Sequence, residues 1–149
     1  MTSTATGTAR PARPASLRLP VASGVAVGGL QVLAPLAFPW LHAMTVHALG
    51  LTAIAAIYIG FAVADGRRHV LAVEIAVASA LVVLAATAVT GSLWLIVAGL
   101  AGHGLKDAWQ HRTHFVRGTR WWPPFCAAVD FAAAALLAVA IVAEHSLTY

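Results

Sequence analysis

Three residues in the most polar part of this sequence have the spacing of successive helical turns. His103, Asp107 and His111 follow one another at intervals of four, and each such step moves only about 40° around a helix axis. One stripe therefore carries imidazole, carboxylate and imidazole, which makes these residues candidate ligands for zinc or a similar divalent metal ion. A complete site would need a ligand from another helix. In the alternative interpretation, His103 and Asp107 hydrogen-bond each other or relay protons.

Glu74 and Asp130 are two further acidic residues within apolar sequence. A carboxyl group in hydrocarbon costs about 3 kcal/mol on insertion scales, so both should face the interior of a helix bundle. In the functional interpretation each is a general acid/base or a metal ligand. In the structural interpretation each is a neutral, hydrogen-bonded acid that fixes helix packing. With His103 and Asp107 they form the candidate catalytic set, and no other cofactor-binding motif is evident.

The composition excludes an ordinary soluble domain. Of the 149 residues, 60% are apolar and 9% are charged, and the mean hydropathy is +0.84, whereas about a quarter of a soluble domain is charged. The net charge of +4 is spread over short segments between apolar runs, which indicates membrane orientation and contact with anionic lipid rather than nucleic acid. The single cysteine, Cys126, has no partner within the chain for a disulfide.

The elements that must position these residues are transmembrane helices. Residues 1–20 lack an apolar period and predict a disordered cytoplasmic tail, although a basic start before an apolar run also resembles a signal peptide. Residues 21–149 predict an all-α integral membrane bundle of about five helices, because about 20 helical residues cross a bilayer. The expected spans are residues 21–40, 43–64, 70–89, 92–111 and 124–143.

The basic residues orient this bundle. With five spans, the tail and the second and fourth loops share one side, which receives all nine Lys and Arg residues. Basic loops stay in the cytoplasm, so we expect the N-terminus inside and the C-terminus outside. Counting about 1.5 Å per residue, Glu74, His103 and Asp130 then lie at one depth, roughly 6–12 Å below the cytoplasmic interface.

The fourth loop has the composition of a lipid headgroup contact. Trp121 and Trp122 suit the membrane interface, and Arg117 and Arg120 can hold lipid phosphate. Gly24 and Gly28 form a Gly-x-x-x-Gly motif, which predicts close helix packing. The expected partners are therefore the bilayer and its anionic lipids, with a homo-oligomer as a further possibility.

The polar motifs also resemble a family of small bacterial multi-pass membrane proteins known only as a domain of unknown function. The resemblance covers residues 57–130. It rests on Asp-Gly-Arg after Tyr-Ile-Gly-Phe, on Glu74, on His-Gly-x-x-Asp, and on Trp-Pro-Pro-Phe-Cys-x-x-x-Asp. The chain departs from the family pattern at Lys106 and Gln110, where tryptophan and a second histidine are common. The resemblance implies a bacterial inner membrane location and brings no activity.

Three functions are compatible with these observations. One is a membrane-embedded metal-dependent or acid/base enzyme acting on a lipid-like substrate. A second is a proton- or cation-coupled transporter subunit, although three-plus-two spans do not divide into inverted halves. The third is a non-catalytic scaffold protein whose polar residues specify helix packing.

Overall fold

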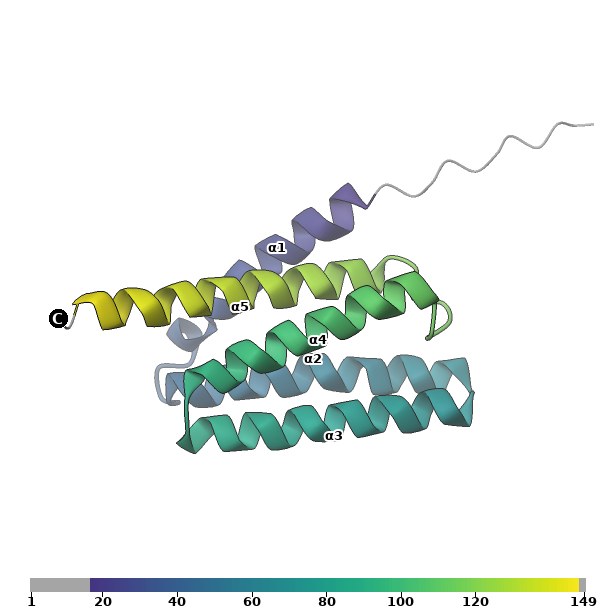
Figure 1. The fold of residues 1–149 in the computed structure, drawn as a ribbon, viewed down its shortest axis with the longest axis horizontal. Coiled ribbons are helices and arrows are strands. Elements are labelled where there is room, and N and C mark those ends of the chain that lie inside the picture. Colours follow the sequence, from purple (N-terminus) through teal and green to yellow (C-terminus); the bar gives the residue numbers. More distant parts are fainter. Residues whose placement is uncertain (1–16, 148–149) are drawn as a thin grey trace, which may run out of the picture.

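The protein is all-helical in the part that the structure describes, residues 17–147 of a computed structural model (Figure 1). The predicted tail lies almost wholly outside these residues, and its last part, from Arg18, already belongs to the first helix, where Pro20 is tolerated within the first turn. No strand occurs among the described residues. The elements are α1 (Arg18–Val32), a short 3₁₀ helix η1 (Ala34–Ala37), α2 (Ala43–Asp65), α3 (Arg68–Thr90), α4 (Leu93–Thr113) and α5 (Trp122–Leu147).

The first expected span, residues 21–40, is not one continuous α-helix. The α-helix ends at Val32 and η1 follows, with Pro35 in its first turn. Proline has no N–H to donate to the carbonyl four residues earlier, and it disfavours the helical conformation at the residue before it. The chain then turns, and the imidazole of His42 accepts a hydrogen bond from the N–H of Met44 (3.3 Å) at the start of α2.

Three of the helices, α2, α3 and α5, are long and apolar enough to cross a membrane. Helix α4 has 21 residues but carries His103, Lys106 and Asp107 together with His111 and Arg112 in its last turn. Helix α1 has 15 residues, which at about 1.5 Å each is shorter than the hydrocarbon core of a bilayer. The expectation of helices at these positions is confirmed for α2 to α5, with boundaries that differ by a few residues.

The helices pack side by side, and both neighbouring and distant helices along the chain pair with each other (Figure 1). The most extensive contacts join α2 with α3, α4 with α5, and α1 with α5, while α3 also contacts α4. Helix α1 crosses α5 at an angle, and Gly24 and Gly28 lie at the crossing. A Cβ atom at Gly28 would lie 2.5 Å from the carbonyl oxygen of Val129, so the Gly-x-x-x-Gly motif does permit close packing here.

The outside of the bundle is apolar and its interior contains charge. Large apolar side chains are exposed on every helix, Leu30, Val63, Val83, Leu105 and Val139 among them. Among the described residues, seven polar or charged ones are nevertheless buried. Because water would favour the reverse arrangement and lipid permits this one, the distribution is that of a membrane protein.

Two apolar clusters divide the interior. The larger apolar cluster includes Leu51, Leu81, Ile96, Leu100 and Leu137, and the smaller apolar cluster consists of Tyr58, Ala62, Val70, Val116 and Cys126. Along α3, α4 and α5, the buried polar residues lie between members of the two clusters. We call the set Glu74, His103, Lys106, Asp107, Gln110 and Asp130 the polar layer.

Candidate functional site

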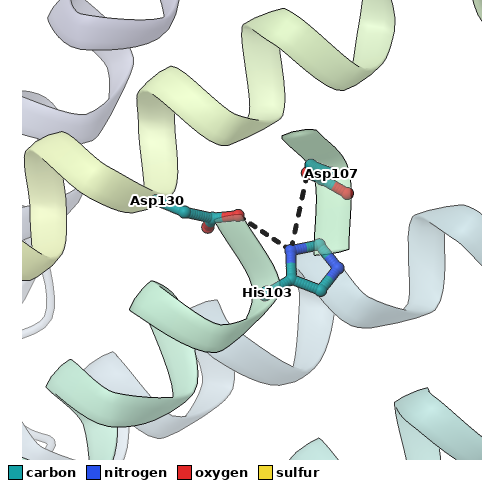
Figure 2. Close-up of side chains that lie close together, drawn as sticks. All are labelled: His103, Asp107 and Asp130. Carbon is teal, nitrogen blue, oxygen red and sulfur yellow. Dashed lines mark hydrogen bonds and ion pairs between the residues drawn. The ribbon is translucent and has the colours of Figure 1, made fainter. Parts of the chain in front are cut away.

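Three buried side chains of the polar layer converge from two helices (Figure 2). The Nδ1 atom of His103 lies 2.8 Å from Oδ2 of Asp130 and 3.7 Å from Oδ2 of Asp107. His103 and Asp107 are one turn apart on α4, and Asp130 reaches them from α5. The three side chains are at most 1% exposed, and one ligand atom from each lies within 4.8 Å of the others. We call this set the His–Asp–Asp cluster.

The cluster has more hydrogen-bonding capacity than the surrounding protein uses. The Nε2 atom of His103, both carboxylate oxygens of Asp107 and Oδ1 of Asp130 are buried without a hydrogen-bond partner. Such groups are uncommon inside proteins, because an unpaired polar atom loses its water and gains nothing in return. Atoms bound at about 2.1 Å to one tetrahedral or octahedral ion lie roughly 3–3.5 Å apart. The Nδ1 atom of His103 is hydrogen-bonded to Oδ2 of Asp130 at 2.8 Å, and this separation and the 3.7 Å to Asp107 lie close to that range.

A second group of the polar layer lies beside the cluster. Lys106 Nζ is 2.6 Å from Oε2 of Glu74, and the amide of Gln110 donates a short hydrogen bond to the other oxygen of Glu74. Lys106 Nζ is also 4.0 Å from Oδ1 of Asp107, which connects the second group to the His–Asp–Asp cluster. This pairing of Lys106 with an acidic residue is one of the arrangements that lower the cost of a charge in a membrane helix.

The polar layer carries an excess of negative charge when its carboxyl groups are ionised. Glu74, Asp107 and Asp130 are three carboxylates, and Lys106 is the one ammonium group among them. With His103 neutral, the form that binds metal, the formal charge is therefore −2. An excess of this size in a low-dielectric interior favours either a bound cation or protonation of the carboxyl groups.

Tyr58 of α2 belongs to the site, and the sequence analysis did not assign it a role. It is fully buried, its ring lies 3.5 Å from Lys106 Nζ, and it contacts the His103 ring edge-on at 5.6 Å between centroids. Its hydroxyl group interacts with the Asp107 carboxylate, although no hydrogen bond of standard geometry joins them. The available signal was a single tyrosine in the middle of an otherwise apolar span, since an amphipathic ring far from the interface needs a polar neighbour.

His111 does not join the His–Asp–Asp cluster. It lies two turns beyond His103, about 12 Å along the helix, and it borders a cavity near the α4–α5 loop together with His114. Asp130 occupies the third position instead, because α5 packs directly against α4 at this level. Of the two candidates for a ligand from another helix, the structure brings Asp130 to His103 and directs Glu74 to Lys106.

The predicted interface residues also lie at this end of the bundle. Arg117 and Arg120 border the same cavity, Trp121 is exposed, and Trp122 packs against the rings of Phe61 and Phe125. Cys126 is buried in the smaller apolar cluster, as expected for a small packing residue.

A hydrogen-bond network joins the α2–α3 turn to the α4–α5 loop. The guanidinium of Arg67 donates to both carboxylate oxygens of Asp65 (2.5 and 2.8 Å) and to the carbonyl of Phe115 (2.6 Å). The N–H of Arg117 donates to Asp65 as well (2.7 Å). The hydrogen bonds that Arg67 donates to Asp65 raise the pKa of Arg67 above the usual arginine value. The positive charge that holds the loop therefore persists at any physiological pH.

Comparisons with family models, with curated proteins and with solved structures found no match for this chain. The resemblance to small bacterial membrane proteins therefore stays a prediction from the motifs, and the functional argument rests on the polar layer itself.

Proposed function

We propose that the chain is a five-span protein of the bacterial cytoplasmic membrane, with its N-terminus and α4–α5 loop in the cytoplasm. The assignment of all nine Lys and Arg residues to one side supports this orientation, and the apolar exterior supports a location in the membrane. In this arrangement α1 and η1 together make the first crossing, and the polar layer lies in the cytoplasmic half. Reporter fusions test it: a fusion at Trp121 should report the cytoplasm, and a periplasmic result would overturn the orientation.

Within this bundle, we propose that the His–Asp–Asp cluster binds a divalent metal ion. The observation that carries the proposal is the convergence of His103, Asp107 and Asp130, all buried, with four of their polar atoms unpaired. A divalent cation would cancel the formal charge of −2 in the polar layer. Three protein ligands are also the number found in catalytic zinc sites, where a fourth position is left for water or substrate.

The function that this arrangement supports best is a metal-dependent enzyme acting on a lipid-like substrate. A metal ion with an open position polarises a substrate oxygen or lowers the pKa of bound water. Lys106 and the Tyr58 hydroxyl lie beside the cluster and are placed to donate a proton or to hold a developing negative charge. Glu74 and Gln110 act as positioning residues, because they hold Lys106 and the adjacent turn of α4.

The surroundings of the polar layer favour a site that opens toward one side only. Toward the far end of the bundle lies the larger apolar cluster, which includes Leu51, Leu81, Ile96 and Leu100. Toward the near end lie the smaller apolar cluster and the cavity beside the α4–α5 loop. Transport would need polar groups on both sides of the site, so this distribution favours catalysis over a cation pathway.

Metal analysis of the purified protein tests the proposed centre. Wild-type protein and His111→Gln should contain about one zinc, manganese or iron ion per chain, whereas Asp107→Asn and Asp130→Asn should lose most of it. His111→Gln is the matched control because it changes the same type of residue on the same helix, outside the cluster. Equal metal content in all four proteins, or none in the wild type, would refute the proposal.

A cation-coupled transporter subunit is the second candidate, favoured by the buried excess of negative charge. Liposomes loaded with a metal-sensitive dye distinguish the two functions. Metal uptake that is lost in both Glu74→Gln and Asp130→Asn would support transport. A metal-containing protein without uptake would support the enzyme.

A further inference from the structure

A cavity of about 190 Å³ lies beside the α4–α5 loop. We call it the loop cavity. Four of the residues that line it have basic side chains, namely His111, His114, Arg117 and Arg120, and none of its lining residues is acidic. At roughly 30 Å³ per water molecule, the cavity has room for one tetrahedral phosphate group and several waters. Its composition therefore suits an anion.

The wall of the loop cavity is held in place by contacts on its outer side. His114 (φ 51°) and Gly118 (φ 78°) adopt the left-handed conformation that turns the chain around the cavity. The Thr119 hydroxyl donates to the carbonyl of Val116 (2.9 Å) within the turn. Asp65, the nearest carboxylate bonded to this loop, is already paired with Arg67. These contacts shape the cavity wall, and no carboxylate lines the cavity beside Arg117 and Arg120.

The loop cavity lies between the start of α5 and the polar layer. It lies at the start of α5, where the positive end of the helix dipole favours anions. Its inner wall includes Gln110, a buried residue that hydrogen-bonds to Glu74. Gln110 is one turn beyond Asp107, about 4.5 Å along the helix, so this residue connects the cavity wall to the polar layer.

We infer that the loop cavity binds the phosphate group of an anionic ligand through Arg117, Arg120 and the neighbouring histidines. This inference rests on the proposed function where it names the substrate class, a phosphate ester with an apolar tail. The exposed Trp121 and the apolar outer faces of α4 and α5 provide the surface along which such a tail would lie. Phosphate binding itself needs only the cavity.

The test compares two double variants that remove the same charge from the same end of the bundle. Arg117→Gln/Arg120→Gln removes the guanidinium groups of the loop cavity, and Arg68→Gln/Arg112→Gln removes two exposed ones outside it. Glycerol 3-phosphate is titrated into each detergent-solubilised protein, and retained phosphatidylglycerol is compared with phosphatidylcholine by native mass spectrometry.

Wild type and Arg68→Gln/Arg112→Gln should bind at least one of these probes, and Arg117→Gln/Arg120→Gln should bind it about tenfold more weakly or worse. Retention of phosphatidylglycerol alone identifies a lipid headgroup as the source of the phosphate, and binding of glycerol 3-phosphate identifies a soluble ester as a ligand as well. Equal affinities of the two double variants, or no binding to the wild type, would overturn the inference.

Asp107→Asn separates this result from the proposed metal function. If Asp107→Asn loses metal but keeps the phosphate probe, both proposals stand. Phosphate binding in a protein that never contains metal would refute the metal centre and leave the loop cavity intact. Metal binding without phosphate binding would refute the inference about the loop cavity and leave the metal centre intact.

Discussion

Substituting alanine at Gly28 and at Gly29 should have opposite effects on stability. A Cβ atom at Gly28 would lie 2.5 Å from the carbonyl oxygen of Val129 and 3.0 Å from Cβ of Ala132, whereas carbon atoms in van der Waals contact lie about 3.5–4.0 Å apart. The obstructing oxygen belongs to the backbone, so α1 and α5 would have to separate. At Gly29 an added Cβ meets nothing within 4 Å.

The expected difference in unfolding free energy follows from these contacts. Overpacking of this kind costs about 1–3 kcal/mol, so Gly28→Ala should be destabilising. Gly29→Ala should be neutral or stabilising by up to about 1 kcal/mol, because alanine favours a helix over glycine. The two variants should therefore differ by about 1–4 kcal/mol, which at about 2–4 °C per kcal/mol for a chain of this size is roughly 2–16 °C in Tm.

Thermal unfolding in detergent micelles, followed by tryptophan fluorescence, measures this difference. Metal content of the folded fraction is a second readout. Because Gly28 meets the side of α5 that carries Val129 and Ala132, whereas Asp130 points toward α4, folded Gly28→Ala protein should keep its metal. If Gly28→Ala is as stable as Gly29→Ala, the close crossing of α1 and α5 is wrong.

Two further predictions concern the polar layer. Glu74→Gln and Lys106→Met should each destabilise the fold by about 3 kcal/mol, since each removes one charge of the ion pair, and the double variant should lose much less than the sum; additive losses in a thermal-unfolding cycle would contradict the ion pair. Gly104→Ala should weaken metal binding by about tenfold, because its Cβ would lie 3.2 Å from Cβ of Asp130. Gly102→Ala should leave metal binding unchanged, because its Cβ would meet nothing within 4 Å. Equal metal affinity of these two variants in a chelator competition would contradict the arrangement.

Much of the fold follows from hydropathy and length. The expected spans 43–64, 70–89, 92–111 and 124–143 correspond to α2, α3, α4 and α5, because apolar runs of about 20 residues between short polar loops have few other stable conformations in lipid. The first span was less predictable. Pro35 and Pro39 are compatible with a kinked membrane helix as well as with a helix end, and the structure ends the α-helix at Val32.

The sequence by itself determined that His103 and Asp107 share one face, since helical periodicity places residues four apart on adjacent turns. It also determined that Glu74 and Asp130 lie at the depth of His103, because their distances from the loops are similar. Only the tertiary structure decided that Asp130 meets His103 and that Glu74 instead binds Lys106. It also decided that the Tyr58 ring contacts both Lys106 and His103. Periodicity sets the face of one helix, but the rotation of each helix toward its neighbours depends on side-chain packing between residues far apart in the chain, such as Gly104 against Asp130 and Phe131.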